Sequence, residues 1–280
     1  MTVINSCMPR KYSNKQIVGI FPAGGVATRI APLPCSKEIF PVSLHYEGAE
    51  NSVRPKVAGQ YLLEKMRLAG AEKAYIILRQ GKWDIPSYFL DGKILDMPLA
   101  YLVLDSSAGV PFTLDQAYPF IQDAHIVFGF PDILLQPDEA FVSLLEKQAQ
   151  SGADLVLGLF PAHQPQKVDM VELDRHGRIT EISIKPIKTN LLYTWLIAAW
   201  SPVFTRFMHD FVAAFRNNIQ DKTALSEIFL GDVIKSAILN NMYLEKVIFK
   251  NGKYLDIGTP EDMAKACQFL IFEQSRKEIP

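Results

Sequence analysis

The sequence is poor in cysteine, in net charge and in long apolar runs. Its three cysteines are far apart and form no CxxC pair, which argues against a disulfide framework or a zinc site and favours a reducing compartment, by default the cytosol. A net charge of -1 provides no long-range field for nucleic acid or an anionic membrane, so an anionic ligand must meet locally placed cations. Residues 191–200, LLYTWLIAAW, are the strongest candidate for a membrane segment. They reach only half of the roughly 20 residues that a membrane span needs, and we interpret them as a buried strand.

Several sequence motifs of common enzyme classes are also missing. Neither GxxxxGK[ST] nor GxGxxG followed by an acidic residue occurs, which disfavours a P-loop kinase and a dinucleotide oxidoreductase. There is no GxSxG elbow, so a covalent serine mechanism has no support. The five histidines show no metal-ligand spacing, and we interpret the histidines as structural. Residues 1–15 are polar and lack an apolar core, which predicts a loose leader and not a signal peptide.

Apolar runs alternate with segments of helical period in the first part of the chain. The runs lie at 17–21, 74–78, 100–104, 124–130 and 154–160, and the helical segments at 57–70 and 138–152. This alternation indicates an α/β core up to about residue 160, with a mostly parallel sheet covered by helices on both faces.

After residue 160 the regular alternation of predicted strands and helices ends. The predicted elements are a hairpin at 167–186, a strand at 190–200, helices at 203–215 and 224–239, a strand at 242–249 and a closing helix from Pro260. We expect one continuous sheet in a single domain, 16–280. The second half should add its own pocket wall, so the boundary at 160 is a soft one.

The first predicted strand leads into the loop PAGGVATRIAPLPCSKEIFPV, residues 22–42. Gly24 and Gly25 present bare backbone N–H groups that a bulky anionic ligand can approach closely. Arg29 and Lys37 add two cations on a loop that prolines stiffen. This layout suits a triphosphate whose leaving pyrophosphate gains charge. The alternative is a tight turn with solvated basic residues.

This loop resembles the signature loop of the sugar-1-phosphate nucleotidyltransferases, the family that includes glucose-1-phosphate thymidylyltransferase. The likeness continues through residues 54–78, through SIKP at 183–186 and through GKYLDIGTPEDMAKA at 252–266. It implies a Rossmann-like, mixed and mostly parallel sheet, with a nucleotide-binding half to about 160 and a sugar-binding half after it. The implied activity is Mg²⁺-dependent: a nucleoside triphosphate is joined to a sugar 1-phosphate to give a nucleotide sugar and pyrophosphate.

The resemblance also assigns roles to individual residues. Asp132 and Asp256 would hold Mg²⁺, although an isolated Asp is more often a turn former or cap. Lys185 would contact the phosphate of the sugar 1-phosphate, in the extended conformation expected before Pro186; a solvated Lys is the alternative. The nucleotide-binding candidates are Ala23, Gly24, Gly25, Thr28, Thr113 and Gln116. The sugar-binding candidates are Ile184, Lys185, Thr194 and Trp195. Gln116 would read a nucleobase edge with its amide, unless it is an ordinary exposed helix residue.

The sequence departs from the family pattern where base and sugar are recognised. Thr113, Pro131 and Trp195 replace glycines, and Ile184 replaces an acidic residue that accepts hydrogen bonds from sugar hydroxyls. Glucose as the substrate is therefore in doubt. A non-catalytic nucleotide-sugar-binding subunit or sensor remains the alternative to an enzyme. The expected partners are a nucleoside triphosphate and a sugar 1-phosphate, without nucleic acid or membrane. Apolar faces on 203–215 and 260–272 leave room for a homo-oligomer.

Overall fold

The computed structural model describes residues 15–47, 52–218 and 227–266. The predicted leader, residues 1–15, therefore lies almost wholly outside the described residues. The same holds for residues 224–226 of one predicted helix and for residues 267–272 of an apolar face considered above.

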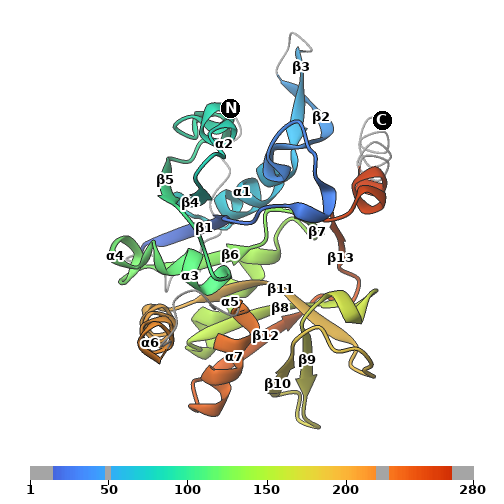
Figure 1. Cartoon of the computed structure of the whole chain (residues 1–280). Coiled ribbons are helices and arrows are strands. Elements are labelled where there is room, and N and C mark those ends of the chain that lie inside the picture. The colour runs from blue at the N-terminus through green and yellow to red at the C-terminus, as the bar shows by residue number, and fades with distance from the viewer. Residues whose placement is uncertain (1–14, 48–51, 219–226, 267–280) are drawn as a thin grey trace.

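A nine-stranded mixed sheet forms the centre of the molecule (Figure 1). Its strands are β1 Ile17–Ala23, β4 Lys73–Arg79, β5 Leu99–Leu104, β6 His125–Gly129, β8 Leu155–Pro161, β9 Met170–Leu173, β10 Ile179–Ser183, β11 Tyr193–Trp200 and β12 Leu244–Ile248. The order is β10-β9-β11-β6-β1-β4-β5, and β8 lies between β11 and β12. Only β10 and β11 of these strands run against the common direction. The fold class expected from the sequence is confirmed, and the sheet continues across residue 160.

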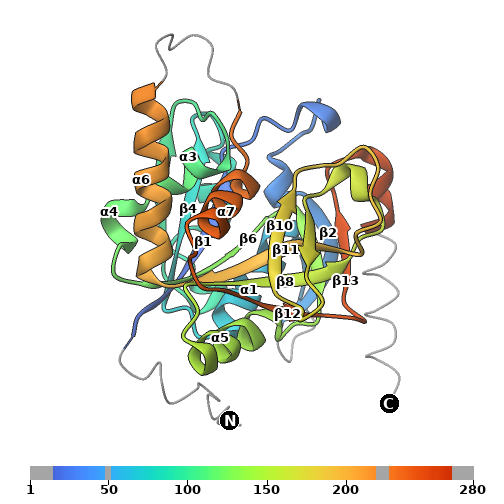
Figure 2. The ribbon, with the colours of Figure 1, turned by 90° about the horizontal axis from the view of Figure 1, so that it is seen from below.

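Helices cover both faces of this sheet. They are α1 Ala58–Leu68, α2 Asp84–Phe89, α3 Val110–Asp115, α4 Tyr118–Ile121, α5 Ala140–Ser151, α6 Pro202–Asn218 and α7 Leu230–Leu239. Buried residues of α1, α2 and α5 share one apolar core, and those of α3, α4, α6 and α7 share the other. Figure 2 shows these two layers on opposite sides of the sheet.

Strand β1 shows why the predicted strands appear as unbroken apolar runs. Ile17 and Phe21 belong to one core, and Val18 and Ile20 belong to the other. Successive side chains of a strand point to opposite faces, so a strand that is buried on both sides needs apolar residues throughout. The strand predicted at 190–200 is confirmed as β11, which is also buried on both faces. No helix among the described residues is long and apolar enough to cross a bilayer.

Most predicted elements after residue 160 are confirmed within a few residues. The hairpin is β9–β10, and residues 260–266 are helical. The helix predicted from 224 is wrong at its start, because residues 227–229 are not helical and α7 begins at Leu230. The Asp232 carboxylate accepts the backbone N–H of Phe229 at 2.9 Å, which caps the helix at that point.

The sequence did not predict two small antiparallel ribbons outside the central sheet. One pairs β2 Pro41–Glu47 with β3 Ser52–Val57. The other pairs β7 Ile133–Gln136 with β13 Lys253–Asp256, two strands that come from opposite halves of the chain. In the second ribbon Asp256 pairs with Ile133, so the two carboxylates of the predicted metal pair are brought to the same end.

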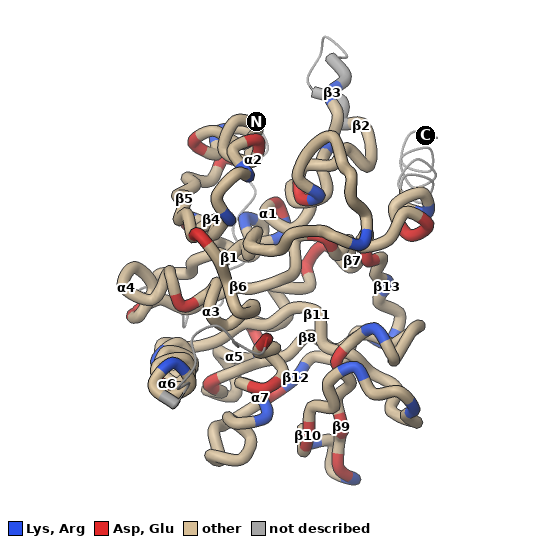
Figure 3. The backbone as a smooth tube through the Cα atoms, viewed as in Figure 1, with Lys and Arg blue, Asp and Glu red and all other residues tan. Residues whose placement is uncertain are grey.

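Charged residues of both signs are interspersed along the described backbone (Figure 3). This distribution agrees with the net charge of -1. Local clusters of charge, and not a general field, must therefore define any site for an anionic ligand.

Candidate active site

The glycine loop follows β1 and meets helix α3. A Cβ atom at Gly24 would lie 3.0 Å from the Thr113 hydroxyl oxygen, whereas one at Gly25 would meet no atom within 4 Å. Thr113 is buried and its hydroxyl lies 2.8 Å from that of Ser107. The structure thus brings Thr113 to Gly24, which directly follows Ala23, the last residue of β1. Thr28 is exposed in a short 3-10 turn, Thr28–Ile30.

Gln116 lies one helical turn beyond Thr113, at the end of α3. It is exposed. Its side-chain nitrogen is 3.5 Å from the Phe112 carbonyl oxygen, which is at the outer limit of a hydrogen bond. A role for its amide at a nucleobase edge stays a prediction.

Asp132 and Asp256 meet at one end of the β7–β13 ribbon. The Ile257 N–H donates to the Asp132 carbonyl oxygen at 2.9 Å, and the Gly258 N–H donates to Asp256 Oδ1 at 2.7 Å. Burial raises the pKa of Asp256, and the nearby charge of Asp132 raises it further. The two carboxyl groups are therefore close enough to repel each other.

Both predicted cations of the glycine loop reach this carboxylate pair. Lys37 Nζ lies 2.5 Å from Asp132 Oδ2. Burial alone would raise the pKa of Asp132, but the Lys37 ammonium outweighs it and holds that pKa below its usual value. Arg29 is exposed, and its guanidinium nitrogen Nη2 is 3.1 Å from the position of a Cβ at Gly258. Two cations and two carboxylates from three distant segments thus form one cluster.

A clamp that sequence analysis missed holds the turn that carries Lys37. On one side, the backbone N–H and the hydroxyl of Ser36 donate to the two oxygens of Asp84 at 2.6 and 2.8 Å. On the other side, Lys82 Nζ donates to both oxygens of Glu38 at 2.8 and 2.9 Å. The partners are more than forty residues apart, so no local pattern could have revealed the pairing.

This clamp leads to a stability prediction. Glu38 is 1% exposed, so Lys82→Met leaves a buried carboxylate without its counter-ion and should lower the free energy of unfolding by about 3–5 kcal/mol. The Lys82→Met/Glu38→Gln double variant should lose clearly less, because no buried charge is left unpaired. Urea unfolding measures both.

The matched control for Lys82→Met is Lys93→Met, at an exposed lysine on a nearby turn. It should change the free energy of unfolding by no more than about 0.5 kcal/mol. Equal losses in the single and double variants would contradict a role for the ion pair.

In the sugar-binding half, the conformation expected for Lys185 is wrong. Its φ is 40°, in the left-handed region, where a residue with a Cβ is strained by roughly 1–3 kcal/mol. In this conformation Lys185 lies close to the Asp169 carboxyl group, whose pKa it lowers. The Lys185 ammonium lies 4.2 Å from the centre of the Phe229 ring, a cation–π contact.

The other sugar-site candidates lie around Lys185 in different ways. Thr194 is fully buried, and its hydroxyl donates to the Asp169 carbonyl oxygen at 2.8 Å. Trp195 is 3% exposed, and its ring centre is 5.6 Å from that of Phe130. Ile184 is half-buried. A sugar-binding role for these three residues stays a prediction, and Thr194 would act through the backbone of Asp169.

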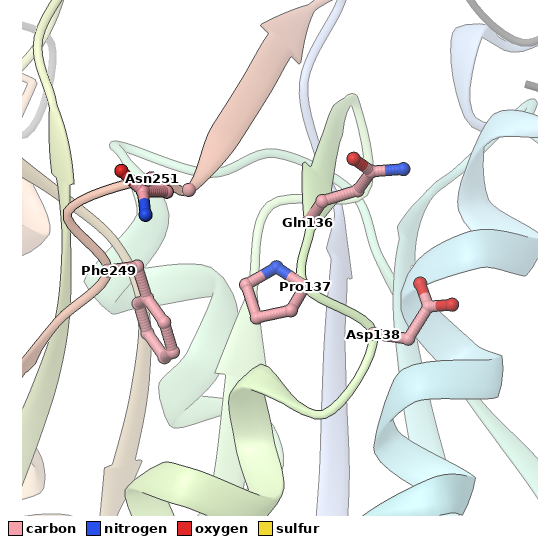
Figure 4. A pocket seen from close by; sticks show the side chains of 6 residues that line it. Gln136, Pro137, Asp138, Phe249 and Asn251 are labelled. Atoms are coloured by element: carbon pink, nitrogen blue, oxygen red, sulfur yellow. The ribbon is translucent and has the colours of Figure 1, made fainter.

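A pocket of about 410 Å³ lies away from the charged cluster. It is lined by Gln136, Pro137, Asp138, Phe249, Asn251 and Gly252, and Figure 4 shows Phe249 and Pro137 facing each other across it. Gln136 and Asp256 mark opposite ends of the β7–β13 ribbon, so the pocket and the carboxylate pair lie at different ends. None of the residues predicted for the site lines this pocket.

The comparison that decides the family covers nearly the whole chain. A family model described as nucleotidyl transferase matches residues 18–272. The chain belongs to the nucleotidyl transferase family. The match spans the glycine loop, both carboxylates and the segment around Lys185.

Individual nucleotidyltransferases are similar to this chain at low identity. The low-salt glycan biosynthesis nucleotidyltransferase of Haloferax volcanii is 22% identical over 265 residues, which are 93% of this chain and 68% of that protein. A glucose-1-phosphate thymidylyltransferase of Xanthomonas campestris is 25% identical over 278 residues, which are 93% and 83% of the two chains. The solved structure of a UDP-glucose pyrophosphorylase with UDP-glucose superposes with a TM-score of 0.72 at 15% identity, over 92% of this chain and 99% of that one. The last likeness concerns the fold alone.

Proposed function

We propose that this chain is a sugar-phosphate nucleotidyltransferase. It joins a nucleoside triphosphate to a sugar 1-phosphate and releases pyrophosphate. The observation that carries this proposal is the cluster of Arg29, Lys37, Asp132 and Asp256, which lies beyond the carboxyl end of β1, next to the glycine loop. Ligands of α/β folds collect at that end of the sheet. Family membership supports the reaction type, and neither nucleic acid nor a membrane takes part.

The two carboxylates fit a magnesium ion. Mg²⁺ is commonly held by one or two carboxylates, phosphate oxygens and water. A divalent cation would also relieve the repulsion that raises the pKa of Asp256. No group of three or more His, Cys, Asp or Glu gathers among the described residues, which fits an ion shared with the substrate better than an all-protein cage. When bound between Asp132 and Asp256, the ion would neutralise negative charge on the phosphates.

In the proposed reaction the protein orients the two substrates and stabilises charge. The N–H groups of Gly24 and Gly25 face the triphosphate, and Lys185 orients the acceptor phosphate. An oxygen of that phosphate attacks the α-phosphorus in line. The bond from the α-phosphorus to the β-phosphate oxygen breaks, and pyrophosphate leaves with the electron pair. Arg29 and Lys37 stabilise the charge that develops on it.

Pyrophosphate release from a panel of triphosphates and sugar 1-phosphates tests this function. Release that requires one of each, with a nucleotide sugar as the second product, is the expected result. The alternative is a nucleotide-sugar sensor with the same fold, which the altered residues Ile184 and Trp195 favour. Tight binding of a nucleotide sugar, without turnover of any pair of triphosphate and sugar 1-phosphate, would contradict the enzymatic function and support the sensor.

A further inference from the structure

Three residues of the sugar-binding half form one row across neighbouring strands. Val171 of β9 pairs with residues of both β10 and β11. Continued by two positions, this register brings Asp169 and Ile184, which lie just outside the ends of β9 and β10, next to each other and next to Trp195 of β11. Asp169 and Ile184 both lie beside Gly231 of α7. We call these three residues, Asp169, Ile184 and Trp195, the Asp169 row. Helix α7 packs against this row.

The Asp169 row contains an unpaired hydrogen-bond acceptor and an unpaired donor. In the part of the chain that the structure describes, three buried side-chain polar atoms have no hydrogen-bond partner, and two of them are Asp169 Oδ1 and Trp195 Nε1. The third is the hydroxyl of Ser201. Buried polar groups are nearly always paired, because an unpaired one costs free energy. An unpaired donor and an unpaired acceptor at adjacent positions point to a partner that the protein itself does not supply.

The neighbours of Asp169 provide space for its carboxylate but do not fully compensate its negative charge. A Cβ at Gly231 of α7 would lie 2.7 Å from Asp169 Oδ2 and 3.2 Å from Ile184 Cγ1, so glycine is what allows the helix to approach. The pKa of Asp169 is raised to about 6, because burial and the charge of Asp232 raise it by more than Lys185 lowers it. The carboxylate is therefore short of hydrogen-bond donors.

The row lies close to the place where the acceptor phosphate is expected. Lys185 directly follows Ile184. On the other side the Trp195 ring contacts Phe130, and Asp132 is two residues beyond Phe130. The row is therefore bordered by the proposed phosphate-binding lysine and by the segment that carries a proposed metal ligand.

A hydroxyl group is the chemical partner that satisfies both unpaired atoms. It can accept a hydrogen bond from the Trp195 indole and donate one to Asp169. An ammonium group would leave the indole N–H unpaired, and a carboxylate or phosphate would be repelled by Asp169. Ile184, the third member of the row, offers no polar atom, so the neighbouring edge of the ligand should be apolar.

Resting on the proposed function, we infer that the Asp169 row selects the acceptor substrate, a deoxygenated sugar phosphate that presents one hydroxyl to Asp169 and Trp195. A fully hydroxylated hexose would leave hydroxyls without partners against Ile184. Both polar atoms of the row are enclosed, and Lys185 and Phe229 border it. The substrate phosphate competes with the Phe229 ring for the Lys185 ammonium, and we expect these two side chains to part as the substrate enters.

The test compares hexose 1-phosphates with monodeoxy and dideoxy analogues. For the wild type, kcat/KM should be highest for a deoxy sugar phosphate. Removal of its one recognised hydroxyl should lower kcat/KM by about 100-fold or more, because the buried groups are then left unpaired. Trp195→Phe and Asp169→Asn, which nearly keep volume, should each reduce this ratio to less than about 10-fold. Trp83→Phe and Asp210→Asn are the controls at exposed positions and should leave the ratio unchanged.

Calorimetric binding of the same sugar phosphates provides a readout that needs no turnover. Binding that discriminates by the hydroxyl without any pyrophosphate release would retain the inference and overturn the enzymatic function. If the wild type turns over all analogues with kcat/KM values within about threefold of one another, the enzymatic function is retained and the inference is overturned. A ratio that both row variants leave unchanged would also overturn the inference. If a variant fails to fold, the wild-type comparison alone still decides.

Discussion

Arg29→Ala should lower kcat/KM for pyrophosphate release by about 10²–10³-fold, roughly 3–4 kcal/mol of transition-state stabilisation. Among the described residues the exposed Arg29 side chain makes no hydrogen bond or ion pair, yet it lies beside Gly258 and the Asp256 carboxylate. Its charge is therefore available to a leaving group. Lys37→Ala should cause a loss of similar size. It should also lower stability, because it removes the partner of Asp132, whereas Arg29→Ala should leave the melting temperature nearly unchanged.

Two further variants separate a role in catalysis from a general effect of charge. Arg206→Ala removes an exposed arginine of α6 and should leave kcat/KM unchanged. Arg29→Lys keeps the charge but loses the planar fork, so it should recover only part of the activity. If kcat/KM falls by less than about threefold in a normally folded Arg29→Ala enzyme, Arg29 does not stabilise the leaving group.

The parts of the fold that the sequence predicted are those with a local cause. Strands β1, β4, β6 and β8 are buried on both faces, so each is a continuous apolar run with distinct ends. Helix α5 ends at Ser151, directly before Gly152, whose φ of 76° suits glycine and which marks the stop in the sequence. Long runs and glycine stops depend little on the rest of the chain.

The parts that were missed depend on partners that are distant in the sequence. Strands β7 and β13 have four residues each and are strands only because they pair with each other. The Ser36–Asp84 and Glu38–Lys82 contacts have the same character. Lys185 departs from the extended conformation that the following proline favours locally, since its φ is 40°.

The candidate site divides in the same way. The glycine loop and its cations were visible because glycines and charges are conspicuous within a short segment. Asp169 was not, because nothing near it in the sequence shows that one of its carboxylate oxygens is buried without a hydrogen-bond partner. Whether a polar atom lacks a partner is a property of the packed structure alone.

Replacing Asp132 or Asp256 by Asn should weaken Mg²⁺ binding and catalysis strongly, while the two changes should affect stability in opposite directions. Lys37 holds the pKa of Asp132 below its usual value, so at neutral pH the ionised form stabilises the fold, and Asp132→Asn should lower the free energy of unfolding. The pKa of Asp256 is raised by burial and by Asp132, so its ionised form costs stability at neutral pH. Without Mg²⁺, Asp256→Asn should therefore raise the free energy of unfolding.

The double variant tests whether one ion links the two residues. If both carboxylates hold the same Mg²⁺, Asp132→Asn/Asp256→Asn should be little worse in kcat than the worse single variant, because residues that act as a unit are not additive. The measurement needs saturating substrates and a Mg²⁺ titration of both kcat and melting temperature, so that weaker binding is not mistaken for slower chemistry. Each single variant should shift the Mg²⁺ midpoint upwards and reduce the rise in melting temperature that Mg²⁺ and triphosphate cause together. Additive losses in log kcat with unshifted midpoints would mean that the carboxylates act separately, and Asp256 would then be a turn residue that accepts the Gly258 N–H.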